Sequence, residues 1–137
     1  MILADTSVWV DHLRVGVPAL AQLLDRGAIL THDWVIGEVA LGNLSDRSQV
    51  IGLLRGLPAA APASAVEVMT LIEQGRLHGL GIGYVDAQLL AATRLTRGAR
   101  LWTSDRRLAA AASHLGNAFE PACSGDAGAQ SDQTSGG

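Results

Sequence analysis

Two carboxylates follow short apolar runs that have the pattern of buried strands. Asp5 comes directly after the run Ile2–Ala4, and Asp105 follows residues 101–103 with one serine between. In an open α/β sheet the active site lies beyond the carboxyl ends of the strands. Because both acids fall at such an end, we expect them to meet at the functional edge of one sheet.

Two further acids lie in otherwise apolar helical patterns. Asp86 precedes Leu89 and Leu90 by three and four residues, which places its carboxylate on the apolar face of the helix. Glu38 lies within the apolar segment 35–41. A buried carboxylate without a partner is strongly destabilising or becomes protonated. We therefore predict that neither acid has a solvated role.

A divalent cation would offset the repulsion among four carboxylates. Mg²⁺ and Mn²⁺ prefer hard oxygen ligands, whereas zinc is disfavoured by a set without cysteine or histidine. Such a site activates water for attack on a phosphodiester. The predicted chemistry is metal-dependent phosphodiester hydrolysis, with the following residues as catalytic groups and metal ligands: Asp5, Glu38, Asp86 and Asp105.

The same four positions also have a purely structural interpretation. Asp5 and Asp105 can cap the helices that follow them, and the helix dipole favours Asp86 in a first turn. Glu38 can pair with an arginine. These roles explain each acid singly, but not why all four fall where an α/β fold would gather them.

The elements that must position these acids alternate between strands and helices. Strands are predicted at 2–4, 28–31 and 99–103, with a further short strand at 57–62 and a last one at 117–120. Helices are predicted from Thr6 or Ser7 onward and at 18–26, 33–41, 45–55 (capped by Ser45), 64–77, 84–96 and 106–114. This order predicts a mainly parallel sheet covered on both faces. Residues 1–120 form one predicted domain, and 121–137, which lack apolar periodicity, a flexible polar tail.

Composition narrows the class of protein. The chain has 137 residues, one cysteine and ten arginines without a lysine, and its net charge of −3 excludes a generally basic nucleic-acid binder. Any contact with nucleic acid must use a local patch or metal ions. A single cysteine excludes an internal disulfide and a thiolate zinc site. Without a signal peptide or a long apolar run, we expect a cytoplasmic protein that does not enter a membrane.

Four segments that carry the acids resemble the PIN-domain ribonucleases, and their order and spacing are similar to those of VapC toxins from type II toxin–antitoxin modules. These segments are 2–7 (ILADTS), 37–39 (GEV), 81–92 (GIGYVDAQLLAA) and 101–105 (LWTSD). The resemblance covers residues 1 to about 120. Each motif alone is weak, but the four together in this order are specific.

The resemblance implies a three-layer α/β/α domain and an endoribonuclease that depends on Mg²⁺ or Mn²⁺. It assigns the four acids to the family's acidic quartet, and it assigns Thr103 and either Thr6 or Ser7 to the hydroxyls that hold those acids. It also implies a homodimer, a VapB antitoxin whose C-terminal segment covers the site, and a structured RNA substrate: transfer, ribosomal or, less often, messenger RNA.

Several other residues have a functional and a structural interpretation. Arg106 and Arg107 can bind substrate phosphate, although a surface arginine pair is more often simply solvated. The three tryptophans are expected to pack in the core, with Trp9 and Trp34 nearer to a groove or interface than Trp102. The four histidines lack the spacing of metal ligands. Cys123 lies in the predicted tail, and we expect it to have no role.

Two other classes of protein compete with a metal-dependent nuclease. A phosphatase with a nucleophilic aspartate after the first strand typically needs a second aspartate two residues on, where this chain has Ser7, and a lysine, which it lacks. A non-enzymatic α/β interaction domain would keep the acids only as caps. None of the four acids is missing, so the sequence favours the nuclease.

Overall fold

The computed structural model describes residues 1–121. The predicted tail, with Cys123, lies outside the described residues apart from Pro121, and the division of the chain at residue 120 stays a prediction. At the centre is a parallel sheet in which β1 (Ile2–Ala4) lies between β2 (Ile29–Leu30) and β3 (Arg100–Trp102). All three residues of β1 are buried, as expected for a strand covered on both faces.

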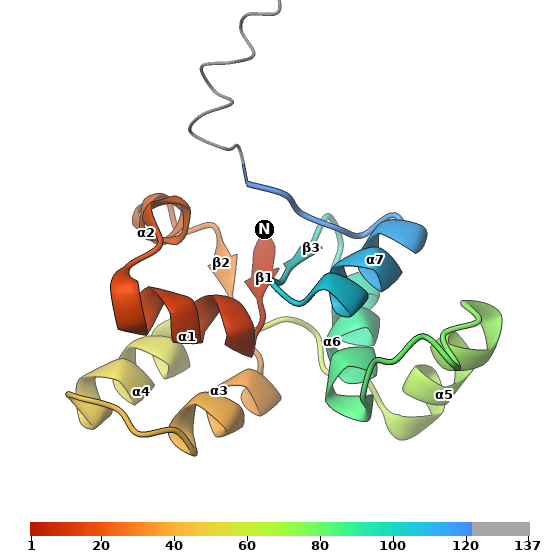
Figure 1. The fold of residues 1–137 in the computed structure, drawn as a ribbon, viewed down its shortest axis with the longest axis horizontal. Helices are drawn as coiled ribbons and strands as arrows, with labels where there is room; N and C mark the ends of the chain where they lie inside the picture. Colours follow the sequence, from red (N-terminus) through yellow and green to blue (C-terminus); the bar gives the residue numbers. More distant parts are fainter. Residues whose placement is uncertain (122–137) are drawn as a thin grey trace, which may run out of the picture.

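Helices cover both faces of the sheet, and Figure 1 shows α1 to α4 gathered on one side and α5 to α7 on the other. The helices of the described part are α1 (Thr6–Val15), α2 (Pro18–Asp25), α3 (Asp33–Ala40), α4 (Arg47–Gly56), α5 (Ala65–Gln74), α6 (Tyr84–Leu95) and α7 (Arg106–His114). The predicted three-layer α/β/α architecture is confirmed.

The predicted strands 57–62 and 117–120 are reduced to single bridges. Ala59 bridges to Thr31, and Ala118 bridges to Leu101, so each extends one edge of the sheet by one pair. Pro58 has no N–H, although its carbonyl accepts a hydrogen bond from the Thr31 amide at 2.8 Å. A segment flanked by prolines lacks the donors for a longer ladder, which accounts for the short pairing of 57–62.

Two helix boundaries were predicted wrongly, and backbone conformation explains both. The helix expected from Ser45 begins at Arg47, because Asp46 has a left-handed conformation with φ 53° and its side chain makes no capping hydrogen bond. The helix expected to reach residue 77 ends at Gln74, because Arg76 also has φ 53°. Left-handed residues of this kind cannot continue an α-helix.

The core contains two of the three tryptophans, as the default interpretation predicted. Trp9 is fully buried, and Trp102 packs edge-on against Phe119 with ring centroids 5.4 Å apart. Leu3 and Leu101, both buried, pair across β1 and β3. Within residues 1–121, no helix is long and apolar enough to cross a membrane.

Candidate active site

Asp5 and Asp105 follow neighbouring parallel strands, as the sequence predicted. Asp5 directly follows β1, and its amide donates a hydrogen bond to the Trp102 carbonyl of β3 at 3.0 Å. Each acid is then the N-terminal cap of the next helix, Asp5 for α1 and Asp105 for α7. The starts of these two helices are therefore held together by the sheet.

A chain of hydroxyl groups connects the two strand ends. The Ser7 hydroxyl donates to Oδ1 of Asp5 at 2.6 Å, and its oxygen lies 3.3 Å from the Thr103 hydroxyl oxygen. The Ser104 amide donates to the Ser7 oxygen at 3.0 Å, and the Asp105 amide donates to the Thr103 oxygen, also at 3.0 Å. Ser7 and Thr103 thus fix the buried carboxylate of Asp5 and the loop that carries Asp105.

Glu38 is oriented differently from the prediction. Helix α3 buries Val35 and Val39, four residues apart on one stripe, and this arrangement turns Glu38 outward into solvent. The inward orientation predicted for Glu38 is therefore wrong. The Thr6 hydroxyl of α1 donates to its Oε1 at 2.8 Å. Of the two hydroxyls that were alternatives in the sequence, Ser7 contacts Asp5 and Thr6 contacts Glu38.

Asp5 is the most buried of the four acids, with 5 % of its surface exposed. Burial raises the pKa of its carboxyl group, because the charged form loses hydration. Hydrogen bonds from Ser7, Thr103 and the Val8 amide lower this pKa, and the negative charge of Asp86 raises it further. Asp5 is therefore surrounded by hydrogen-bond donors, and the charge of Asp86 acts on its carboxyl group.

Asp86 lies in the first turn of α6 and is half-buried. Burial raises the pKa of its carboxyl group, and the Gly83 amide, which donates to Oδ2 at 3.2 Å, lowers it. The charges of Asp105 and Glu38 raise the pKa again. Asp86 therefore couples electrostatically to the three other acids, and the four carboxylates belong to one negatively charged region.

The capping interpretation is also correct, but it uses only part of each side chain. The Leu108 amide donates to Oδ1 of Asp105 at 3.0 Å, and the Val8 amide donates to Oδ1 of Asp5 at 3.2 Å. In Glu38, Asp86 and Asp105, the hydrogen bonds found within the described residues reach one carboxylate oxygen each. The second oxygen of each remains available to another ligand.

The acids fit a divalent cation in chemistry, although they do not form a closed coordination sphere. No three His, Cys, Asp or Glu side chains in residues 1–121 stand close enough to hold a metal ion as they are. The one ion pair in this part of the chain joins Arg14 to Asp11 at 3.3 Å, so no guanidinium neutralises the four acids. Hard oxygen donors with unopposed negative charge are the ligands that Mg²⁺ and Mn²⁺ prefer.

Arg106 and Arg107 are exposed at the start of α7, directly after Asp105. With Arg76 and His114 they line a hollow of about 460 Å³, and no carboxylate in residues 1–121 pairs with any of these arginines. The Arg107 side chain lies against Gly81, where an added Cβ would come within 2.7 Å of its guanidinium. The structure thus places free positive charge on α7, in the two residues that follow Asp105.

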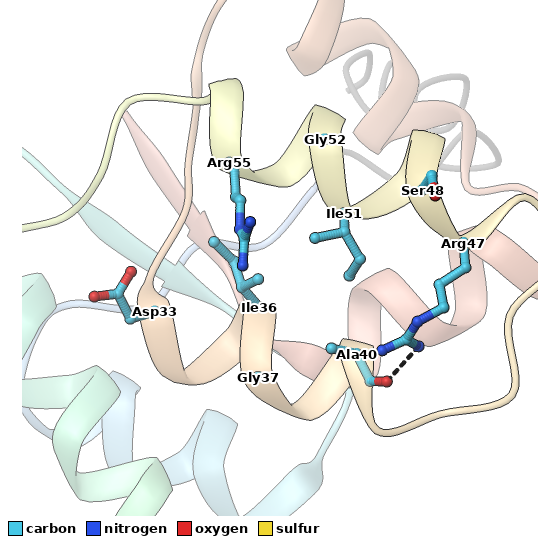
Figure 2. A pocket seen from close by; sticks show the side chains of 9 residues that line it. All are labelled: Asp33, Ile36, Gly37, Ala40, Arg47, Ser48, Ile51, Gly52 and Arg55. Carbon is cyan, nitrogen blue, oxygen red and sulfur yellow. Dashed lines mark hydrogen bonds between the residues drawn. The ribbon is translucent and has the colours of Figure 1, made fainter.

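A second hollow, of about 620 Å³, lies between α3 and α4. Figure 2 shows Ile36 and Ile51 directed into it, with Arg55 at one end and Arg47 bonded to the Ala40 carbonyl at the other. None of the four acids lines this hollow. Despite its volume, this hollow is therefore not the candidate active site.

Two exposed aromatic residues near the acids were not among the predicted site residues, although Trp34 was expected to lie nearer to a groove or interface than Trp102. Trp34 was expected in the core but is 39 % exposed, so that expectation is wrong, and Tyr84, which was not considered, is 44 % exposed. Each stands at the start of a helix that carries one of the acids, Glu38 or Asp86. Their positions, a few residues before Glu38 and Asp86 in the sequence, were the signal that could have identified them.

The fold and the site together define the class. The domain has a parallel sheet between two helical layers, with acids after two neighbouring strands and two more on α3 and α6. This is the organisation of a PIN-type nuclease domain.

No protein-family model matches the chain. It is 45 % identical over 119 residues to Ribonuclease VapC32 of Mycobacterium tuberculosis strain CDC 1551 / Oshkosh, and equally to Ribonuclease VapC32 of strain ATCC 25618 / H37Rv. Each match covers 87 % of this chain and 96 % of the relative. The chain belongs to the VapC family of PIN-domain ribonucleases.

Proposed function

We propose that the protein is the toxin of a type II toxin–antitoxin module, an endoribonuclease that hydrolyses RNA phosphodiester bonds with Mg²⁺ or Mn²⁺ and is inhibited by a VapB antitoxin. The observation that carries the proposal is the group of four electrostatically coupled carboxylates without a basic partner among the described residues. The relatives, both named ribonucleases, support the same activity.

Asp5, Glu38, Asp86 and Asp105 would hold the cation. When bound, a divalent ion supplies an activated water and stabilises the negative charge that develops on the phosphate. The protein's own hydroxyl groups hold the ligands: Ser7 and Thr103 fix Asp5, and Thr6 fixes Glu38. Ligands that are already oriented keep the reacting groups in place, which favours attack in line with the leaving oxygen.

Arg106 and Arg107 would bind phosphates of the RNA on either side of the cleaved bond. Phosphate contacts from arginine fix the register of a nucleic acid without reading its sequence. They also offset the repulsion between an acidic site and a polyanion. The arginines are free for this role, because no ion pair within residues 1–121 engages them.

The partners follow from the same assignment. We propose a cytoplasmic homodimer that binds a cognate VapB-type antitoxin and acts on transfer, ribosomal or messenger RNA. The relatives' name places them among VapC proteins, which supports this set of partners.

The deciding experiment is cleavage of total cellular RNA by purified protein free of antitoxin, with Mg²⁺, with Mn²⁺ and with EDTA. We expect discrete fragments that require a metal and disappear in Asp86→Ala. Glu73→Gln, which changes an exposed acid of α5, is the matched control and should cleave like the wild type. A folded wild-type protein that cleaves nothing under any condition would overturn the proposal in favour of an interaction domain.

A further inference from the structure

The chain has five aromatic residues, all of them in the described part, and they divide into two groups. Trp9 and Trp102 are buried, and the partly buried Phe119 packs against Trp102. Trp34 and Tyr84 are the exposed ones, at 39 % and 44 %. Large aromatic rings usually contribute most to a fold when they are buried. Two rings left in solvent by a protein with so few aromatics therefore suggest a contact made outside the fold.

The two exposed aromatics are in contact with each other. The ring centroids of Trp34 and Tyr84 lie 5.9 Å apart, and the ring planes are inclined at 49°. The two residues come from α3 and α6, which belong to the helical groups on opposite sides of the sheet. The pair, called here the aromatic platform, therefore joins the two layers, and its exposed surface comes from both.

The aromatic platform adjoins the acidic region. Trp34 precedes Glu38 by four residues, so both lie on the same side of α3, one turn apart. Tyr84 is the first residue of α6, and Asp86 lies in the same turn. Because the rings of Trp34 and Tyr84 lie 5.9 Å apart, the first turns of α3 and α6, which carry them, stand beside each other. A ligand bound at the acids has the aromatic platform as its neighbour.

The chemistry of this neighbourhood selects which part of an RNA strand can occupy it. A phosphate is repelled by nearby carboxylates, whereas a nucleobase is uncharged and stacks on an aromatic face. Trp34 also borders a hollow of about 260 Å³ formed with Pro62, Gln88 and neighbouring residues, which leaves room beside its ring. A base fits the aromatic platform better than the sugar–phosphate backbone does.

We propose that Trp34 and Tyr84 form a stacking platform for an unpaired nucleobase of the RNA, adjacent to the bond that is cleaved. The inference rests on the proposed ribonuclease function. It names the substrate class more closely: the strand must present an unstacked base beside the scissile phosphate, as a loop or a single strand does and a continuous duplex does not. Both side chains are positioning residues for substrate.

Binding without cleavage tests the platform directly. A short single-stranded RNA is titrated into the protein in EDTA at low salt, with fluorescence anisotropy for affinity and tryptophan emission for contact. Because Trp9 and Trp102 are buried, quenching by RNA should come from Trp34 and be absent in Trp34→Phe. We expect Trp34→Ala and Tyr84→Ala to weaken binding by about fivefold to 100-fold, the range set by loss of one stacked base.

Conservative variants separate stacking from folding. Tyr84→Phe keeps the ring and should bind like the wild type, and Trp34→Phe should retain most of the affinity. Leu53→Ala removes a side chain of similar exposure, 50 %, from α4 and should change nothing. Thermal denaturation shows whether each variant is folded. A loss of affinity in Trp34→Ala that Trp34→Phe does not share, at equal melting temperature, supports the platform.

Cleavage kinetics measured with a divalent cation distinguish a failure of the aromatic platform from a failure of the proposed ribonuclease function. We expect Trp34→Ala to raise KM for a loop-containing RNA with a smaller change in kcat, and to have less effect on a duplex that is already a poor substrate. An active wild type with an equally active Trp34→Ala overturns the platform alone, whereas a wild type without activity overturns the proposed function. A variant whose RNA affinity and KM are unchanged but whose sedimentation shifts would assign the pair to a protein interface instead.

Discussion

The Ser7 hydroxyl lies 2.6 Å from Oδ1 of Asp5 and holds the most buried acid of the site in place. The same oxygen accepts a hydrogen bond from the Ser104 amide at 3.0 Å, so one side chain joins the ends of β1 and β3. Removing the side chain that both hydrogen bonds share costs free energy. Ser7 therefore serves both stability and the orientation of Asp5.

Replacing Ser7 with alanine should lower both activity and stability. The Ser104 amide loses its acceptor, and Asp5 loses a donor that lowers its pKa, so the charged form of Asp5 becomes less favourable. We expect a loss of about 0.5–1.5 kcal/mol in the free energy of unfolding. The cleavage rate should fall, with a pH dependence moved to higher pH. Chemical denaturation and a pH–rate profile measure both, with exposed Ser113→Ala of α7 as the control.

Asp5→Asn should abolish cleavage without destabilising the metal-free protein at pH 7. Burial raises the folded-state pKa of Asp5 above 3.8, so the folded state binds a proton more readily than the unfolded state. The stability that follows is present at acidic pH and is lost as pH rises through the folded-state pKa. At pH 7 the wild type keeps the penalty of a buried charge, whereas asparagine removes it and still accepts from Val8.

Melting curves at pH 7 in EDTA measure this effect. The melting temperature of Asp5→Asn should equal or exceed that of the wild type, and the difference should shrink as the pH is lowered toward 4. Added Mg²⁺ should raise the melting temperature of the wild type more than that of the variant, because a ligand that binds only the folded state stabilises it. A large loss of stability in EDTA would show that the carboxylate is structural.

His32 should make the fold sensitive to mild acid. Its Nδ1 accepts a hydrogen bond from the Trp34 amide at the start of α3, and burial lowers the pKa of the imidazole below 6.5. A lowered folded-state pKa means that this stability is fully present above the unfolded-state pKa of 6.5 and is lost as the pH falls from there through the folded-state pKa. Protonation removes the acceptor that caps the helix.

Urea denaturation between pH 7.5 and pH 5 tests this dependence. The wild type should lose stability over this window, and His32→Asn, whose side chain can cap the helix without titrating, should lose less. His78→Gln changes an exposed histidine and controls for the loss of an imidazole elsewhere. An identical slope for the wild type and His32→Asn would contradict the assignment.

The sequence was sufficient to locate Asp5 and Asp105, because strand ends in a parallel sheet are marked by where an apolar run stops. It could not orient Glu38. Nearly every neighbour of Glu38 in 35–41 is apolar, so the pattern does not identify the face that the fold buries, and only packing of Val35 and Val39 decides it. Sequence patterns of this kind specify that a helix forms, but not always how it is rotated.

The contact between Trp34 and Tyr84 could not be predicted from the sequence, for a reason different from that for Glu38. Trp34 and Tyr84 meet only because α3 and α6 are brought together by the sheet, and no local pattern records a contact between residues so far apart in the chain. The end of α5 could not be predicted either, because nothing in the sequence indicates that Arg76 has a positive φ. Contacts between the two helical layers can be identified only from the tertiary structure. The same holds for left-handed residues other than glycine.

Gly81→Ala should impair RNA binding more than stability, and Gly79 provides a matched comparison. Both glycines have positive φ, 79° and 76°, so alanine is strained at either position by about 1–2 kcal/mol. A methyl group at Gly81 would also come within 2.7 Å of the Arg107 guanidinium, whereas nothing lies within 4 Å at Gly79. The flexible arginine will move away from its place against residue 81, and its guanidinium will no longer be held near the start of α7.

The two variants should therefore lose similar stability but differ in function. In the cleavage assay we expect a higher KM for Gly81→Ala than for Gly79→Ala, approaching that of Arg107→Ala. In an Arg107→Ala background, Gly81→Ala should have no further effect on KM, because the displaced side chain is already absent. Equal KM values for the two glycine variants would remove Arg107 from the proposed phosphate contacts, while the acidic site would be unaffected.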